Sequence, residues 1–228
     1  MAATMTRSLR ALAWLLRYPD AELRAAAPAL RDALHAEGAL PASRLAEIDA
    51  LVDRLCGLPG LRAEADYVDL FDRGRRAALH LFEHVHGDSR DRGTAMVDLA
   101  QTYERAGLVL AGGELPDYLP LVLEFASTQP SRQAREFLLE TAHLVRAIFT
   151  ALAERNSAYA SVLAAVLDLA GEPAEKVVLP EEPALDESWE EPAAFGGCSS
   201  AGQSRPDRPQ PIRIVRRAPQ SSQPERPA

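Results

Sequence analysis

The sequence predicts an all-α fold, a single globular bundle of several helices followed by a disordered C-terminal tail. Through residue 170 the chain is dominated by alanine, leucine, arginine and glutamate, which are strong helix formers. No run in this part alternates apolar and polar residues with the period of two that a half-buried strand requires. Beyond residue 170 the composition becomes proline-rich, with ten of the 17 prolines in residues 171–228.

Helices are expected, in order, over about residues 4–17, 20–36, 42–57, 61–72, 75–86, 89–107, 116–128, 131–155 and 157–170. Helix-breaking residues separate the early helices, because Pro19 precedes the second, Pro41 the third and Pro59 the fourth. Apolar residues recur at helical spacing over 134–152, which predicts a long core helix. The connections are short, so neighbouring helices are expected to pack antiparallel.

Composition divides the chain into a helical domain, residues 1–170, and a tail, residues 171–228. Residues 171–191 hold eight acidic residues and one lysine, whereas the residues from 192 onward hold six arginines and two acidic residues. Such a segment buries too little apolar surface to offset the entropy lost on ordering, so disorder is predicted. Trp189 and Phe195 stand among acidic residues in the tail, as either a short docking motif or an idle solvated segment.

Charge and hydropathy exclude several classes of protein. The formal net charge of −8 disfavours nucleic-acid binding, which needs a basic surface. The apolar run near the N-terminus is interrupted by Arg17 and lacks a cleavage site, so it indicates a first helix and not a signal peptide. No apolar stretch reaches the ~20 residues of a membrane span. Cys56 and Cys198 are far apart, which suits a reducing compartment, and we expect a cytoplasmic protein without membrane insertion.

The most conspicuous chemical motif is His80-x-x-Glu83-His84, the inverted form of a zinc-protease helix motif. In a helix over 75–86 these three side chains would share one face, as zinc binding requires. The opposite, core-facing side of that helix would hold Ala78, Leu81, Phe82 and Val85. No third ligand in a recognisable context accompanies the histidines. A polar outer face is therefore the simpler interpretation, and a zinc-dependent hydrolase is the alternative.

The residues after this motif predict a corner between two helices. Gly87 suits the left-handed position that ends a helix, and Asp88 or Ser89 suits the N-cap of the next. Arg90 and Arg92 oppose the dipole of that next helix. Arg92 is therefore expected to find a carboxylate partner, whereas Arg90 is expected to be exposed. The candidate partners are Asp72, Glu114 and Asp117, and the buried stripe of this helix is expected to be Met96, Leu99, Ala100 and Tyr103.

Two longer stretches carry a family resemblance. They are "YVDLFDRGRRAALHLFEHVHGDSRDRGTAMVDL" (67–99) and "YERAGLVLAGGELPDYLPLVLEF" (103–125). Together with "LLRYPDAEL" at the end of the first helix, they resemble the NarJ-type assembly chaperones of respiratory nitrate reductase. These chaperones belong to the wider all-helical family of redox-enzyme maturation chaperones for molybdenum enzymes. The resemblance covers about residues 9–170 and leaves out the tail.

The resemblance implies a protein that is not an enzyme and has no cofactor of its own. It implies a system-specific chaperone that binds the apo catalytic (α) subunit, including its N-terminal segment, and keeps it competent for molybdenum cofactor insertion and assembly. The implied partners are the apo α subunit and its N-terminal peptide, with molybdenum cofactor delivery proteins as further candidates. Beside the hydrolase, the remaining alternative is a helical scaffold that acts through the Trp189 motif.

A client site is expected where helices give way to loops, at the Gly87 corner and in the "ELPDYLP" loop. An amphipathic client helix needs an apolar groove and acidic residues for its basic ones, so Asp117 and Glu124 are assigned to client arginines. On this interpretation Asp117→Arg weakens client binding without loss of helix. Tyr118 stands where the wider family often has a histidine. The candidate client-binding residues are Tyr67, Phe71, Asp72, Phe82, His86, Asp88, Arg92, Met96, Glu114, Leu115, Pro116, Asp117, Tyr118, Leu119 and Glu124.

Two alternatives remain open within this set. For the aromatic residues, packing in the core is the simpler explanation. Asp72, Asp88 and Arg92 are equally explained by a buried ion-pair network, in which loss of one partner leaves a charge unpaired.

Overall fold

The computed structural model describes residues 4–86, 90–110 and 113–179, without the side chains of His86 and Arg90. The helical elements of these residues are α1 (Thr6–Leu15), α2 (Ala21–Glu37), α3 (Ala42–Gly57), α4 (Gly60–Phe71), the 3-10 helix η1 (Arg75–Ala77), α5 (Glu83–His86), α6 (Arg90–Arg105), α7 (Leu119–Thr128), α8 (Ser131–Glu154) and α9 (Ala160–Ala170). Strand-like pairing is limited, within the described ranges, to one bridge between His80 and Tyr118. The all-α prediction is confirmed. The predicted disorder of the tail stays a prediction from residue 180 onward, because those residues lie outside the described ranges.

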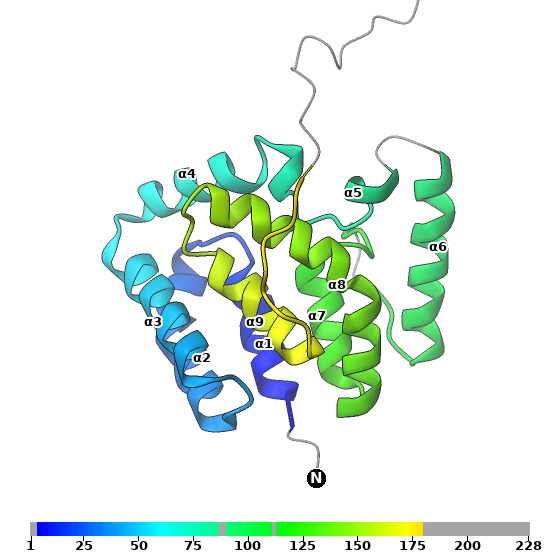
Figure 1. Ribbon diagram of the computed structural model, residues 1–228, viewed down its shortest axis with the longest axis horizontal. Coiled ribbons are helices and arrows are strands. Elements are labelled where there is room, and N and C mark those ends of the chain that lie inside the picture. Colours follow the sequence, from blue (N-terminus) through cyan, green and yellow to red (C-terminus); the bar gives the residue numbers. More distant parts are fainter. Residues whose placement is uncertain (1–3, 87–89, 111–112, 180–228) are drawn as a thin grey trace, which may run out of the picture. The chain divides into compact units, whose positions relative to one another are not determined.

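The core is built around α9, which lies in the middle of the bundle (Figure 1). A helix that is apolar on all sides must be buried, and in α9 every residue from Ser161 to Ala170 is buried except Asp168. The half-buried Asp168 accepts a hydrogen bond from Arg44 of α3 at 2.8 Å. Helices α8 and α9 pack together, and α1 packs on α7 and α2. The long core helix expected from residues 134–152 is therefore present as α8.

Helix boundaries follow the residues that the sequence marks as breakers. Asp20 caps α2, because its side chain accepts a hydrogen bond from the backbone N–H of Leu23 at 2.8 Å. Helices α3 and α4 begin directly after Pro41 and Pro59. The left-handed φ of +63° at Gly38, which a side chain would strain, ends α2. The predicted punctuation of the first four helices is confirmed.

The first turn of α1 is capped from outside the helix. Glu37, the last residue of α2, accepts hydrogen bonds from the backbone N–H groups of Arg7 and Ser8 at 3.2 and 2.7 Å. These N–H groups have no partner within α1, and a carboxylate also complements the positive end of the helix dipole. Burial raises the pKa of Glu37, but the hydrogen bonds from Ser8 and Arg7 outweigh it and hold the pKa below its ordinary value.

The single helix predicted over 75–86 is wrong. The chain forms η1, then a non-helical stretch over 78–82, and only then the short α5. The cause is a tertiary interaction, because Leu81 donates its backbone N–H to the carbonyl of Asp117 (3.0 Å) and Leu79 accepts from Leu119 (2.8 Å). Backbone groups that pair with a distant loop are not available for helical hydrogen bonds. The same pairing delays the start of α7 to Leu119, three residues after the predicted start.

After α9, residues 171–179 run back along α8. Glu172 pairs with Arg146 of α8 at 2.5 Å, and Val177 donates its backbone N–H to the hydroxyl of Thr150 at 3.1 Å. Ala174 packs against the core. The first nine residues of the predicted tail therefore contact the helical part. Within the described residues, no helix has both the length and the apolarity that a bilayer crossing requires.

Glu37→Ala is expected to lower the free energy of unfolding by about 1 kcal/mol at neutral pH, the usual effect of removing a helix N-cap. Because the pKa of Glu37 is lowered in the folded state, this stability is present above the ordinary carboxyl pKa of about 4.3 and is lost as the pH falls through the folded value. Urea denaturation across a pH series measures both effects. Glu140→Ala, at an exposed position of α8, is the control. An unchanged unfolding free energy for Glu37→Ala at neutral pH would contradict the cap.

Candidate functional site

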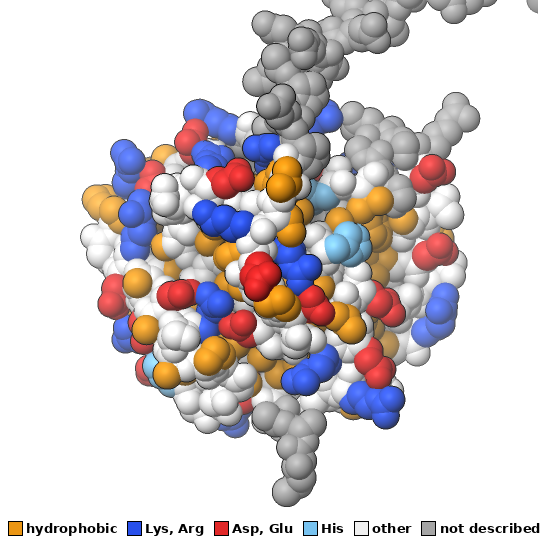
Figure 2. Space-filling model, in the orientation of Figure 1, with side chains coloured by type: hydrophobic (Ala, Val, Ile, Leu, Met, Phe, Trp, Pro, Cys, Tyr) orange, Lys and Arg blue, Asp and Glu red, His pale blue; other side chains and the backbone are white. Residues whose placement is uncertain are grey.

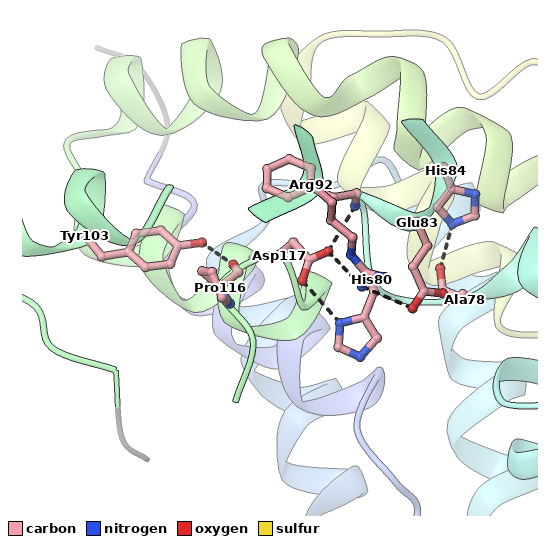
Figure 3. Close-up of polar contacts among 9 residues, drawn as sticks. Ala78, His80, Glu83, His84, Arg92, Tyr103, Pro116 and Asp117 are labelled. Atoms are coloured by element: carbon pink, nitrogen blue, oxygen red, sulfur yellow. Dashed lines mark hydrogen bonds and ion pairs between the residues drawn. The ribbon is translucent and has the colours of Figure 1, made fainter. Parts of the chain in front are cut away.

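The carboxylate of Asp117 is fully buried in the loop before α7. One oxygen accepts the backbone N–H of Phe82 at 3.1 Å, and the other lies 3.3 Å from Nδ1 of His80 (Figure 3). Nη2 of Arg92, on α6, is 3.9 Å from the first oxygen. A buried carboxylate is strongly destabilising unless it is paired and hydrogen-bonded. The partners of Asp117 come from two separate segments, which it thereby ties to its own loop.

Backbone pairing fixes the same loop on both sides. The hydrogen bonds of Leu81 and Leu119 described above flank Asp117, and Tyr103 of α6 donates its hydroxyl to the carbonyl of Pro116 at 2.8 Å (Figure 3). We call this assembly the Asp117 junction, formed by residues 78–83, Arg92, Tyr103 and residues 116–119. It joins two loops and both ends of α6 into one unit.

The histidine motif is dispersed within this junction. His80 contacts Asp117, Glu83 accepts from Arg92 at 3.2 Å, and Nε2 of His84 lies 2.8 Å from the carbonyl oxygen of Ala78. Each of the three side chains therefore has a different partner (Figure 3). Among the described residues, no group of three histidine, cysteine or acidic side chains is placed to hold a metal ion. The zinc hypothesis required the three side chains to share one helical face, and this prediction is wrong.

The environment of His80 favours its protonated form. The hydrogen bond with Asp117 raises the pKa of His80 above its ordinary value, and the negative charges of Asp117 and Glu83 act in the same direction. Partial burial and the positive charge of Arg92 lower it by less. A charged imidazole next to a buried carboxylate compensates the negative charge that Asp117 brings into the interior.

A groove of about 410 Å³ opens beside the junction, in the size range of ligand sites. One wall is the segment 108–110 that follows α6, and the outer face of α7 forms another part of the lining. The lining residues are Arg17, Tyr103, Leu108, Val109, Leu110, Glu114, Tyr118, Pro120, Leu121, Glu124, Phe125 and Thr128. Tyr103 and Tyr118 belong to both the groove and the junction, so the geometry of the groove depends on the junction.

The groove combines apolar surface with a small negative charge. Most of its lining side chains are apolar or aromatic, and the side chain of Val109 is 88% exposed at its edge. Glu114 and Glu124 provide two negative charges, and Arg17 provides the one positive charge among the described lining residues. Leu115, beside Glu114, is a further exposed apolar side chain. Such a surface suits a segment with apolar and basic side chains.

Of the predicted client-binding residues, the structure brings Glu114, Tyr118 and Glu124 to the groove. Phe82, Arg92, Pro116 and Asp117 take part in the junction through the contacts given above. Arg92 pairs with Asp117, one of its three expected partners, and also with Glu83. Within the described part of the chain, its ion pairs do not include Asp72 or Glu114, the other two expected partners. Asp117 is interior, so the assignment of its carboxylate to a client arginine does not fit its position in this structure.

The other predicted residues lie elsewhere. Tyr67 and Phe71 are buried in an aromatic cluster with Tyr159, with ring centroids 4.6 to 6.0 Å apart, and Leu119 is buried in the core. Asp72 is exposed. Met96, Leu99 and Ala100 are half-buried on α6, where only Tyr103 of the expected stripe is fully buried. Asp88 and the side chain of His86 lie outside the described residues.

Tyr118 connects the groove to this aromatic cluster. Its ring centroid lies 5.3 Å from that of His80, and its hydroxyl interacts with that of Tyr67. Tyr67 in turn donates its hydroxyl to the carbonyl of Leu16 at 2.8 Å. Tyr118, which stands where the wider family often has a histidine, is therefore held from two sides.

Sequence reasoning missed several parts of the groove, among them the segment 108–110, Arg17 and the outward face of α7. Arg17 comes from the end of α1, about a hundred residues away, and no local signal places it there. Leu121, Phe125 and Thr128 share one face of α7 at helical spacing, but the first five residues of the helix are all apolar, so periodicity does not show which face is outward.

Comparison with known proteins identifies the relatives of this chain. Residues 17–165 match the family described as nitrate reductase delta subunit. The chain is 41% identical over 189 residues to the nitrate reductase molybdenum cofactor assembly chaperone NarJ of Escherichia coli K12, covering 78% of this chain and 79% of that protein. It is 30% identical over 167 residues to the probable NarJ chaperone of Bacillus subtilis, covering 69% of this chain and 84% of that protein.

A solved structure shares the fold. The putative redox enzyme maturation protein of Archaeoglobus fulgidus aligns with a TM-score of 0.51 and 20% identity, covering 74% of this chain and 94% of that chain. The chain belongs to the nitrate reductase delta subunit family. This is a family of maturation chaperones and not of enzymes, so the expectation that the chain is not an enzyme is confirmed.

Asp117→Ala is expected to lower the free energy of unfolding by about 3 kcal/mol, because it leaves the guanidinium of Arg92 and the N–H of Phe82 without this partner. Asp117→Arg is expected to be still more damaging, in place of the unchanged helical content predicted from the sequence. Denaturant unfolding monitored by circular dichroism measures the loss. Asp98→Ala, at an exposed position of α6, is the matched control. A change below about 0.5 kcal/mol for Asp117→Ala would contradict the importance of the junction.

The stability of the protein is expected to fall as the pH rises from about 6 to 8. The pKa of His80 is raised in the folded state, so its contribution is fully present below the ordinary histidine pKa of about 6.5 and is lost as the pH rises through the folded value. His80→Gln removes this slope, and His143→Gln, at an exposed position of α8, retains it. Thermal melting across this range tests the assignment, and equal slopes for wild type and His80→Gln would refute it.

Proposed function

We propose that this protein is a system-specific chaperone for nitrate reductase maturation. It binds the apo catalytic (α) subunit, including the N-terminal segment of that subunit, and keeps it competent for molybdenum cofactor insertion and assembly. The names of the relatives support the general role. The observation that carries the finer proposal is the apolar groove beside the Asp117 junction, with Glu114 and Glu124 among its lining residues.

The groove supports a binding mode in which an amphipathic client segment lies along α7. Leu121 and Phe125 contact the apolar side of the segment, and Glu114 and Glu124 attract its basic residues. Helix α7 has ten residues and is therefore about 15 Å long, which matches about three turns of a client helix. Recognition of this kind uses one short segment of a client that is otherwise unfolded, so it suits an assembly chaperone.

The helical part, residues 1–170, is the chaperone domain in this proposal, and residues 171–228 are an appended tail. The metal chemistry belongs to the client, and the chaperone itself carries no cofactor. Molybdenum cofactor delivery proteins are further partners in this proposal, since they must reach the same apo subunit. The setting is the cytoplasm, where a reduced Cys56 is compatible with its exposed position.

Calorimetric titration of the full-length chain with a peptide copying the N-terminus of the cognate α subunit tests the groove. Saturable one-to-one binding is expected, and it should weaken with salt because part of the attraction is electrostatic. Leu121→Asp places a charge on the apolar floor and is expected to weaken binding at least tenfold. Glu124→Lys is expected to weaken it about threefold and to reduce its salt dependence, as a partly exposed charge contact does.

The matched control is Glu140→Lys, a charge reversal at an exposed position of α8 outside the groove. It should leave the affinity unchanged. Undiminished binding by Leu121→Asp would place the site elsewhere on the chain. Absence of binding by the wild type would mean that the N-terminal segment is not the element recognised.

A further inference from the structure

A second concave surface lies between α3, α4 and residues 155–159, which connect α8 to α9. In Figure 1, α3 and α4 stand on the side of the bundle away from α6. The hollow has a volume of about 300 Å³, and its apolar lining includes Leu51, Leu55, Leu58 and Leu70. None of its lining residues belongs to the groove described above. It is therefore a separate candidate for binding.

The rim of this hollow carries more arginines than carboxylates. Asp66 pairs with both Arg54 (3.1 Å) and Arg62 (2.8 Å). Asp69 likewise pairs with Arg73 at 2.9 Å and with Arg155, whose nearest nitrogen is 3.8 Å away. Arg73 lies outside the lining of the hollow, so the lining itself holds three guanidinium groups and two carboxylates, a local excess of one positive charge. On the side where α3 and α4 lie, Figure 2 shows several blue side chains with red ones between them.

This excess is unusual in its setting, because the whole chain has a formal net charge of −8. The side chains of Arg54 and Arg62 are 58% and 69% exposed, so they are accessible from solvent. A guanidinium has five N–H donors, and a shared carboxylate occupies only some of them. The remaining donors have the planar geometry that binds an external carboxylate through two hydrogen bonds.

Arg155 has a structural role within the same rim. It donates to the backbone carbonyls of Asp69 and Leu70 at 3.1 and 3.4 Å, at the C-terminal end of α4. Carbonyls in the last turn of a helix lack helical partners, and a cation there complements the helix dipole. The bond fixes the corner between α8 and α9 against α4, so the hollow is held open by the fold itself.

We propose that this arginine-rimmed hollow binds an acidic segment of a partner protein. An apolar side chain of that segment enters the hollow, and carboxylates on either side of it pair with Arg54 and Arg62. Charge complementarity favours an acidic occupant, because the rim of the hollow has an excess of positive charge whereas the groove has an excess of negative charge. The basic client segment proposed for the groove and an acidic partner would thus bind at different places and simultaneously. The inference does not depend on the proposed function.

The test is a nuclear magnetic resonance titration of the full-length, ¹⁵N-labelled protein with the capped peptide EEWEELEE as the probe. Saturable shifts are expected at the amides around the hollow, such as those of Leu58, Arg62 and Ser157. The double variant Arg54→Glu, Arg62→Glu is expected to weaken binding at least tenfold. Replacing the tryptophan of the probe by serine keeps its charge and removes the apolar anchor, and is expected to weaken binding several-fold.

The matched control is Arg132→Glu on α8. Arg132 is 88% exposed and pairs with Glu136 at 2.9 Å, so this reversal also breaks an exposed ion pair but leaves the hollow intact. Affinity should remain at the wild-type level. If the double variant unfolds, Arg54→Gln with Arg62→Gln replaces it, because loss of exposed ion pairs changes stability little.

Four results would overturn the proposal. The first is the absence of chemical-shift changes at millimolar probe, and the second is weakening by Arg132→Glu as strong as that by the double variant. The third is an affinity for the serine probe equal to that for EEWEELEE, and the fourth is an equal affinity for the basic peptide KKWKKLKK. Addition of the α subunit N-terminal peptide is expected to leave the affinity for EEWEELEE unchanged, and displacement of the probe would also contradict a separate site. The client groove is tested by other variants, so failure of one proposal leaves the other standing.

Discussion

The buried carboxylate of Asp117 is the constraint on which the irregular part of this fold depends. A negative charge is stable in the interior only with several partners at short range, and those partners belong to segments that are distant in the sequence. Asp117 is 37 residues from His80 and 35 from Phe82. The loops over 78–82 and 116–119 must therefore reach one relative position before the charge is compensated. Arg92 adds α6 to the same requirement.

The groove depends on this constraint although Asp117 does not line it. Leu108 donates its backbone N–H to Tyr103 at 3.0 Å, and Tyr103 is bonded to the carbonyl of Pro116. One wall of the groove is thus connected to the loop that Asp117 holds. Tyr118, the next residue, lines the groove and stacks near His80. If the groove binds the client as proposed, substitution of Asp117 would alter that binding through the shape of the groove, and such a result would not show that the carboxylate touches the client.

Sequence reasoning succeeded where structure is determined locally. Gly38 ends α2, and Pro41 and Pro59 directly precede α3 and α4, because these residues act through their own backbone. The apolar spacing in α8 specifies a buried face. Sequence reasoning failed at 78–82, where helix-forming residues such as Leu79 and Leu81 pair with a distant loop. Local propensity differs between conformations by tenths of a kcal/mol per residue, whereas an unpaired buried carboxylate is destabilising by several. The tertiary interactions of Asp117 therefore decide the conformation of residues 78–82.

The same reasoning limits what the sequence says about the site. Glu114, Tyr118 and Glu124 were identified because they stand in or near a proline-bracketed loop, a local feature. Arg17 required the fold. The histidines were conspicuous because of their spacing, but spacing implies a shared face only within a helix, and this segment is not one. A motif of three residues is therefore informative only after its secondary structure is known.

Two surfaces with opposite charge preferences have different consequences in a chain of formal net charge −8. On the proposed function, a basic client segment would be attracted by the protein as a whole, and the overall field would accelerate its encounter with the groove. An acidic partner is repelled by most of the surface and attracted only within about a Debye length of the arginine rim, roughly 8 Å at physiological salt. Such a partner binds only when its acidic segment is placed correctly, since misplaced encounters are repulsive. The arginine-rimmed hollow would therefore select its partner by position as well as by charge.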